Sequence, residues 1–415
     1  MSRTPASLGR RRWIGLSLVL YLAACQFPAT ESQTAPISPT GAPYLETEQP
    51  AILGTSPSAL EPSATPTSAR ADPTLSDSAT EPRPTPTPSL IGPGYVPGVN
   101  PLTGLPAADP QALTSAPLLV SIANFPPSAR PQAGVSVAAQ VWETYIGEGM
   151  TRWLAVYYGD YIQNLKQILA NRLAEGSAQD FVIGPVRSGR VVYEDIKTLF
   201  PNAKLLIAGA SAEVAEQLTN RSSVFGSDPN DINSAGLQPQ DLRQENLAQV
   251  DPAYYASLTF SDAQPAGCQE APAVRIVYNY YNHVGWQFNP ARGVYLRSQD
   301  EADGTGQLFP ANDRLSGEQL AFENVIVLFA QHRYVTSTII EMELLYVKNR
   351  NGLLFRDGVV CPVKWSSLRG KLQIHNVQGT IVPLKPGPSF FEVVSNETTW
   401  NAEKMEVRFH TPPRP

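Results

Sequence analysis

Ile183-Gly184-Pro185-Val186-Arg187-Ser188-Gly189-Arg190 is the stretch around which the folded part of this chain is organised. It ends an apolar run at 181–183, turns at Gly184-Pro185 and enters a segment, 191–200, that we predict to be helical. A strand-to-helix turn presents free backbone N–H groups and the positive end of the helix dipole. Two arginines three residues apart at such a turn are typical of an anion-binding site. The pattern indicates a ligand and does not reveal a reaction.

The composition separates a foldable part of the chain from a part that is not. The chain has 415 residues and 39 prolines, and 15 of these prolines lie between residues 26 and 98. That segment contains no lysine and only two arginines, Arg70 and Arg83. The net charge of −6 argues against nucleic acid as a partner.

The N-terminus has the pattern of an export signal. Basic residues at 3–12 precede an apolar core at 13–22, which is too short to span a hydrocarbon layer of ~30 Å. Leu22-Ala23-Ala24-Cys25 matches the lipobox of bacterial lipoproteins, in which the cysteine carries the lipid. We therefore expect 1–24 to be a lipoprotein signal peptide and lipidated Cys25 to anchor the protein to the outer face of the cell membrane. The alternative is an ordinary signal peptide with a chance cysteine.

Residues 25–96 are expected to form a disordered tether. Their proline, serine, threonine and alanine content cannot bury enough apolar surface to fold. As a coil the segment would span roughly 45–50 Å, which would hold the folded part away from the lipid surface.

Cys268 and Cys361 remain after Cys25 is assigned to the lipid. Disulfides persist in exported proteins, so these two cysteines allow one bridge. Two buried free thiols in different sheets are the alternative, and the sequence does not decide between them.

The apolar periodicity predicts an α+β fold with two domains. In the first, a mixed α/β domain at 97–260, strands are expected at 117–122, 139–146, 151–158 and 204–208, and helices at 191–200 and 211–218. The two runs around Gly147-Glu148-Gly149-Met150 are typical of a hairpin. In the second, a mainly β domain at 261–412, strand-like runs lie at 274–278, 294–297, 324–328, 341–346 and 390–394.

The candidate ligand-binding residues are arginines of the first domain together with one asparagine after its first strand: Arg130, Arg152, Arg187, Arg190 and Asn124. Arginine's planar fork suits bidentate binding of carboxylate or phosphate. Two acidic residues, Glu143 and Glu148, lie on or beside the predicted hairpin. The alternative to a ligand site is that Arg187 and Arg190 pair with Glu143 or Glu148 and tie loops together.

Familiar catalytic motifs are missing from the sequence. It has no Gly-x-Ser-x-Gly elbow, no His-Glu-x-x-His, no phosphate-binding P-loop and no Cys-x-x-Cys. The four histidines are far apart in sequence, which favours isolated residues over a zinc site. We therefore expect no metal and no cofactor.

Several stretches resemble the YerB-like bacterial lipoproteins, a family of unknown function with an N-terminal domain and a distinct C-terminal companion domain. In the first domain the resemblance is carried by Asn100-Pro101-Leu102-Thr103-Gly104-Leu105-Pro106, Ala129-Arg130-Pro131-Gln132-Ala133-Gly134, Val141-Trp142-Glu143-Thr144-Tyr145, Gly149-Met150-Thr151-Arg152-Trp153 and the Arg187–Arg190 motif. In the second it is carried by Gly293-Val294-Tyr295-Leu296-Arg297, Asn324-Val325-Ile326-Val327, Phe355-Arg356-Asp357-Gly358 and Leu384-Lys385-Pro386-Gly387.

The chain departs from the family pattern in two places. The family's Pro-His-Asn-Leu-Tyr stretch corresponds here to Asn230-Asp231-Ile232-Asn233-Ser234, so only Asn233 carries over and the histidine is lost. Phe390-Phe391 stands where relatives tend to have Thr-Trp. The resemblance implies an exported, two-domain lipoprotein and supplies no reaction.

Two classes of function remain on these grounds. The first is an anchored binding or scaffold lipoprotein whose partners are the membrane, through Cys25, and an anionic envelope polymer or envelope protein. The second is a hydrolase or transferase of envelope glycan or phosphodiester that uses Glu143 or Glu148 as acid/base. A third interpretation makes all these polar residues internal ties.

Overall fold

The computed structural model describes residues 89–176 and 180–414. The predicted signal peptide, the lipid-bearing Cys25 and the predicted tether up to residue 88 lie outside the described residues. The described residues form one compact unit. Ordered contacts begin before the predicted end of the tether, because the backbone of Ile91 pairs with that of Phe260 (N···O 2.9 Å).

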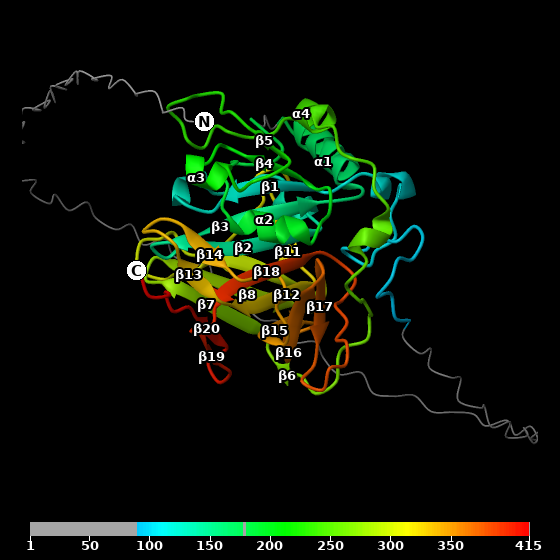
Figure 1. The fold of residues 1–415 in the computed structure, drawn as a ribbon. Helices are drawn as coiled ribbons and strands as arrows, with labels where there is room; N and C mark the ends of the chain where they lie inside the picture. Colours follow the sequence, from blue (N-terminus) through cyan, green and yellow to red (C-terminus); the bar gives the residue numbers. More distant parts are fainter. Residues whose placement is uncertain (1–88, 177–179, 415) are drawn as a thin grey trace, which may run out of the picture. The chain divides into compact units, whose positions relative to one another are not determined.

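One mixed sheet of eleven strands runs through the whole unit (Figure 1). Its strands, in spatial order, are β17 (Lys371–His375), β16 (Val359–Leu368), β15 (Arg350–Arg356), β12 (Asn324–Ala330), β18 (Ser389–Ser395), β2 (Gln140–Gly147), β3 (Met150–Tyr157), β1 (Leu118–Ala123), β4 (Lys204–Ile207) and β5 (Arg221–Ser223), with β6 (Gln269–Glu270) paired to β16. The predicted hairpin is confirmed as β2 and β3, which are antiparallel.

The centre of this sheet is buried on both faces. All six residues of β1 and all seven of β18 are buried, and most of them are apolar, as expected for strands covered on both faces. Phe391 of β18 stacks on Trp142 of β2, with ring centroids 4.2 Å apart. Phe390 packs edge-on against Trp153 of β3 and Trp286. The Phe390-Phe391 pair therefore lies in the main core.

A second sheet is built from the later part of the chain. Its strands are β10 (Phe309–Pro310), β9 (Val294–Gln299), β8 (Asn282–Asn289), β7 (Ala273–Asn279), β20 (Glu406–Arg408) and β19 (Thr399–Asn401), with β11 (Ala321–Phe322) paired to β9. A separate two-stranded sheet consists of β13 (His332–Tyr334) and β14 (Ile340–Met342). The mainly β character predicted for 261–412 is confirmed.

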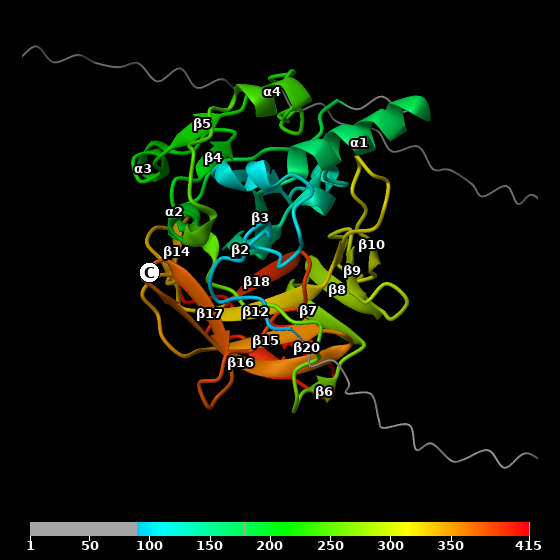
Figure 2. The same ribbon diagram turned by 90° about the vertical axis from the view of Figure 1, so that its right-hand side faces the viewer.

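Helices are few and lie in the earlier part of the chain, around β1, β4 and β5 (Figure 2). They are α1 (Tyr161–Ala174), α2 (Val192–Thr198), α3 (Ala212–Ala215) and α4 (Pro239–Gln244), with short 3-10 helices at Pro110–Thr114, Pro127–Ala129, Val135–Val137 and Pro252–Tyr255. Within the described residues, no helix combines the length and apolar character that crossing a membrane requires.

The predicted mixed α/β character of the first domain is only partly confirmed, because the structure is mostly sheet with few helices. The helix predicted at 191–200 is α2, whereas the one predicted at 211–218 shortens to the four residues of α3. The strand predicted at 341–346 is also too long, since β14 ends at Met342. The longest helix, α1, was not predicted.

Strands from both sides of the predicted boundary at residue 260 belong to one sheet. Strand β18, from the second predicted domain, pairs in parallel with β2 from the first and with β12 from its own. The domain limits 97–260 and 261–412 therefore stay a proposal about sequence units, and in space the two segments share one sheet.

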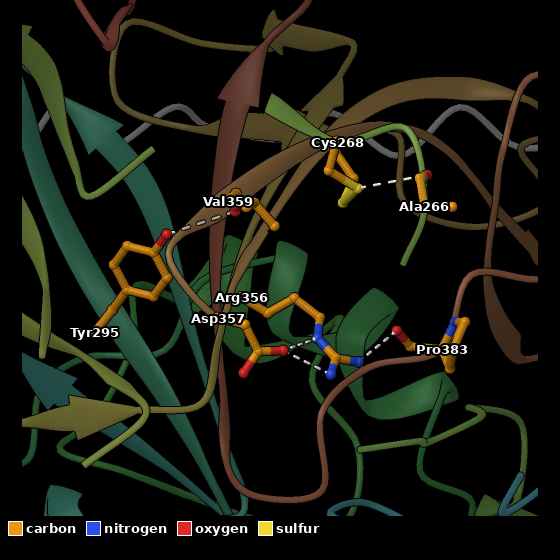
Figure 3. The surroundings of a disulfide bond; sticks show 8 residues. Ala266, Cys268, Tyr295, Arg356, Asp357, Val359 and Pro383 are labelled. Carbon is orange, nitrogen blue, oxygen red and sulfur yellow. Dashed lines mark hydrogen bonds and ion pairs between the residues drawn. A yellow bond between two sulfur atoms is a disulfide. The ribbon is translucent and has the colours of Figure 1, made fainter. Parts of the chain in front are cut away.

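Cys268 and Cys361 are joined by a disulfide. Cys268 directly precedes β6, and β6 pairs with β16, the strand that carries Cys361. Figure 3 shows this disulfide together with Arg356, whose guanidinium donates to Asp357 Oδ2 (2.7 Å) and to the Pro383 carbonyl (3.2 Å). The bridge connects the exposed loop before β6 to β16, the strand next to β17 in the long sheet.

Candidate functional site

The Arg187–Arg190 stretch lies against the ends of β1 and β4. Arg187 N donates to the Ser121 carbonyl (2.8 Å), and the Arg187 carbonyl accepts from Ala208 N (2.9 Å). Gly189 N donates to the Gly209 carbonyl (2.9 Å). Gly189 is closely packed, because a Cβ atom there would lie 2.5 Å from Leu218 Cδ1 and would require that side chain to shift. The stretch is therefore held as an extended segment between two strands.

These bonds occupy two of the backbone N–H groups that the predicted anion site would use. The N–H groups of Arg187 and Gly189 are already bonded, and α2 begins only at Val192 and has seven residues. The full positive charges of the stretch are those of its two arginine side chains.

Two guanidinium groups from different elements meet at one carbonyl. Arg152, on β3, is 7% exposed and donates from Nη1 to the Ser188 carbonyl (3.0 Å). Arg190 Nη1 contacts the same carbonyl (3.5 Å) and donates to the Gly189 carbonyl (2.8 Å). Arg152 Nη2 has no hydrogen-bond partner among the described residues, and Arg152 Nε is buried without one.

Arg187 extends from the same stretch toward the loop 228–234. Its Nη1 donates to the Ile232 carbonyl (2.6 Å) and its Nη2 to Asn233 Oδ1 (2.8 Å). Asn233 donates in turn to Ser128 Oγ (3.2 Å). Arg187 thus fixes a surface loop beside the other two arginines.

The three arginines Arg152, Arg187 and Arg190 lack carboxylate partners within salt-bridge distance among the described residues. Burial, together with the nearby charges of Arg190 and Arg187, lowers the pKa of Arg152 to about 10. Burial also lowers the pKa of Arg187 and of Arg190, while Asp231 acts in the opposite direction on Arg187. The result is a partly buried positive cluster, which we call the Arg152–Arg190 cluster.

Arg130 lies in a different environment. It donates from Nε to the Asn124 carbonyl (3.0 Å) and from Nη1 to the Asp300 carbonyl (2.6 Å), and it lies over the ring of Phe125 at 4.7 Å. Burial lowers the pKa of Arg130 to about 10. Its contacts connect it to the second half of the chain and not to the Ser188 carbonyl.

Glu143 and Asn124 belong to a closed interior network. Glu143 is fully buried; its Oε2 forms an ion pair with Arg297 Nη2 (2.7 Å). Its Oε1 accepts from Asn124 Nδ2 (3.1 Å) and from Thr151 Oγ1. Asn124 is itself fully buried and also donates to Thr151 Oγ1 (2.8 Å). Neither side chain is open to a ligand.

Sequence reasoning missed two members of this network, Arg297 and Glu392. Both are fully buried, and Glu392 accepts from Tyr278 OH (2.8 Å) and Trp286 Nε1 (3.0 Å). Burial, followed by the negative charge of Glu143, raises the pKa of Glu392 to about 8. A signal was present, because both residues interrupt strongly apolar strand patterns at 294–297 and 390–394.

Glu148 is at the tip of the hairpin, where it is exposed and has a positive φ of 52°. Its carboxylate pairs with Arg414 near the end of the chain. Since Glu143 pairs with Arg297, neither acidic residue ties down Arg187 or Arg190, and the loop-tying alternative is not realised by these pairs. No group of three or more metal-ligating side chains gathers within residues 89–176 and 180–414.

Comparison with known proteins agrees with the resemblance seen in the sequence. Residues 102–246 match the model described as "Protein of unknown function (DUF3048) N-terminal domain". Residues 274–391 match the corresponding C-terminal domain model. A Bacillus subtilis (strain 168) protein named "Putative lipoprotein YerB" is 26% identical over 328 residues, which cover 74% of this chain and 89% of that protein.

A solved structure supports the fold. The crystal structure of the YerB protein from Bacillus subtilis superposes with a TM-score of 0.55 at 22% identity, covering 71% of this chain and 96% of that one. The two family models together match more than half of the chain, in the order that the motifs predicted. This chain therefore belongs to the DUF3048 family, the YerB-like proteins.

Proposed function

We propose that this protein is a lipid-anchored extracytoplasmic binding lipoprotein whose ligand is an anionic group of the cell envelope. The lipobox pattern at 22–25 and the name of the Bacillus subtilis relative support the anchor. The Arg152–Arg190 cluster supports the anionic ligand. The partner is an envelope polymer or envelope protein that presents carboxylate or phosphate groups.

The observation that carries the proposal is a set of three arginines that form no ion pair with a carboxylate among the described residues. Burying a cation costs free energy unless an opposite charge compensates it. Carbonyl oxygens satisfy some of the N–H groups of Arg152 and Arg190 but do not neutralise their charge. An anion at this place would supply the missing charge and accept from the remaining N–H groups.

The three arginines have different roles in this proposal. Arg152 and Arg190 contact the ligand, because their guanidinium groups meet at Ser188 and retain N–H groups without partners in the described residues. Arg187 contributes positive charge and positions the 228–234 loop through Ile232 and Asn233.

The test is titration of residues 89–415 with inorganic phosphate and with isolated cell-envelope fragments. Arg152→Ala and Arg190→Ala are each expected to weaken binding by about tenfold, equivalent to ~1.4 kcal/mol. Binding by the unaltered protein is expected to weaken as salt rises, because the contact is electrostatic. Calorimetry measures the phosphate arm, and co-sedimentation measures the envelope arm.

Arg292→Ala is the matched control. Arg292 is an exposed arginine in the turn between β8 and β9, and it forms no ion pair among the described residues. The Arg292→Ala variant removes one positive charge outside the Arg152–Arg190 cluster and is expected to leave binding unchanged. Equal binding by all four proteins would contradict the proposal.

No observation favours the alternative of an envelope hydrolase or transferase. The two oxygens of Glu143 are bonded inside a closed core, so this carboxyl group is not placed to protonate or deprotonate a substrate. Glu148 is at the hairpin tip, away from that core network, and pairs with Arg414. We propose binding and no reaction.

A further inference from the structure

A second polar site lies where the two family-matched segments meet. A pocket of about 470 Å³ is formed by residues 127–132, which follow β1, and by residues 299–312, which include β10. Its apolar wall includes Pro127, Pro131 and Phe309, and its charged wall contains Arg130, Asp300 and Glu301. Volumes of this size are typical of small-molecule sites.

The charged wall contains two unpartnered atoms of opposite charge. Arg130 Nη2 and Asp300 Oδ1 are both shielded from solvent, and neither has a hydrogen-bond partner in the part of the chain that the structure describes. The backbone N–H of Ala302 nevertheless favours the charged form of Asp300 and lowers its pKa, against the larger effect of burial, which raises it. Asp300 is 1% exposed. A buried charged group without a partner destabilises the protein, and an opposite charge in the adjoining pocket offsets that effect.

Backbone contacts hold both side chains, and among the described residues the two form no ion pair with each other. Arg130 uses Nη1 on the Asp300 carbonyl and Nε on the Asn124 carbonyl. Asp300 uses Oδ2 to accept from His283 N (3.0 Å). The Arg130 guanidinium therefore contacts the backbone of Asp300 and not its carboxylate.

Two other polar side chains of the pocket are already committed. Gln132 donates to the Ala123 carbonyl (2.8 Å), and Gln299 donates to Asn282 Oδ1 (3.2 Å) and accepts from Arg297. Glu301, in contrast, is exposed at the pocket wall. A ligand thus encounters one cation and two carboxylates beside an apolar surface.

We propose that this pocket binds an α-amino acid with an apolar side chain. The carboxylate of the ligand pairs with Arg130, and its ammonium group pairs with Asp300 and Glu301. The side chain packs against Phe309, which is 38% exposed, and the neighbouring prolines. An α-amino acid matches the site because it carries an ammonium group and a carboxylate on one carbon atom, and the pocket wall presents a guanidinium together with two acidic side chains.

This inference is independent of the Arg152–Arg190 cluster, which shares no residue with the pocket. Failure of one site to bind therefore leaves the other proposal intact.

The test compares L-leucine with two analogues that each lack one charge. Isoamylamine lacks the carboxylate, and 4-methylpentanoate lacks the ammonium group, while both retain the apolar body. Calorimetric titration of residues 89–415 is expected to show binding of leucine and at least tenfold weaker binding of each analogue. The proposal is overturned if leucine gives no heat at its solubility limit, or if either analogue binds as tightly as leucine.

Two variants assign the binding to this pocket. Asp300→Asn is expected to weaken leucine binding at least tenfold, and Glu301→Gln to weaken it by a smaller factor. Glu301 is exposed, so its variant is expected to fold even if Asp300→Asn does not. Circular dichroism checks folding, and Arg292→Ala is the matched control with unchanged binding. A folded Glu301→Gln that binds leucine as tightly as the unaltered protein contradicts the proposed role of the acidic wall.

Discussion

Arg297 is the residue at which the interior of the protein is most constrained. It is fully buried, pairs with Glu143 and lies over the rings of Trp153 (4.7 Å), Phe390 (5.4 Å) and Trp286 (5.7 Å). Removing one member of a buried ion pair leaves the other charge uncompensated, at a cost of about 3–5 kcal/mol. The contacts make Arg297 a structural residue and explain why Glu143 is unavailable for chemistry.

Glu392 adds a second buried carboxyl group to this network. One arginine faces two acidic residues, and burial and the charge of Glu143 raise the pKa of Glu392 to about 8. The folded protein therefore binds a proton here that the unfolded chain, with its ordinary glutamate pKa, releases above about pH 4.5. This contribution to stability is fully present below about pH 4.5 and is lost as pH rises through about 8.

We predict that Glu392→Gln flattens this pH dependence. The amide mimics the protonated carboxyl group and can still accept from Trp286. Urea unfolding at several values between about pH 5 and pH 9 measures the slope, which is expected to be smaller for the variant.

Glu403→Gln is the control for the pH series, because Glu403 is exposed. It is expected to retain the slope of the unaltered protein. Identical slopes for Glu392→Gln and the unaltered protein would show that Glu392 does not hold this proton.

Among the elements, β18 connects the two halves of the long sheet. It lies between β2 and β12, parallel to both, and all its residues are buried. Without β18, the edge of β2 and the face of Trp142 that stacks on Phe391 would be exposed. An unpaired apolar edge strand is an aggregation site.

We therefore predict that residues 97–260 do not fold alone, although they form the first predicted domain. The fragment is expected to aggregate or to show no cooperative thermal transition, whereas residues 97–412 show one. Circular dichroism and size-exclusion chromatography make the comparison. A monomeric fragment with a cooperative transition would establish 97–260 as an independent domain.

At the scale of the whole molecule, the proposed role depends on attachment at Cys25. This residue and the predicted tether up to residue 88 lie outside the described residues, so the anchor rests on the sequence pattern and on the name of the relative. We predict that Cys25→Ser moves the protein from the membrane fraction to the soluble fraction in a bacterial host, because a peptide without acyl chains lacks the anchor.

Fractionation followed by immunoblotting measures that distribution. Cys268→Ser is the matched control, since it removes a cysteine without touching the predicted lipid site, and it is expected to stay with the membrane. Retention of Cys25→Ser at the membrane would contradict lipid anchoring through this residue.

The sequence by itself determined the local elements and the family. The hairpin β2–β3, helix α2, strand β4 and the β-rich later segment follow from apolar periodicity and turn residues, which are properties of neighbouring residues. The helix α1 was predictable from Ile162, Leu165 and Leu169, whose spacing places them on one face. The family motifs likewise occur as continuous stretches.

Only the tertiary structure decided which charges meet. Glu143 pairs with Arg297, 154 residues away. Arg152 and Arg190 both reach the Ser188 carbonyl. Arg130 donates to the Asp300 carbonyl. These partners are set by long-range strand pairing and by how β18 enters between the halves of the sheet. Charge alone fixes what an arginine can bind, but the packing of distant strands fixes which group it reaches.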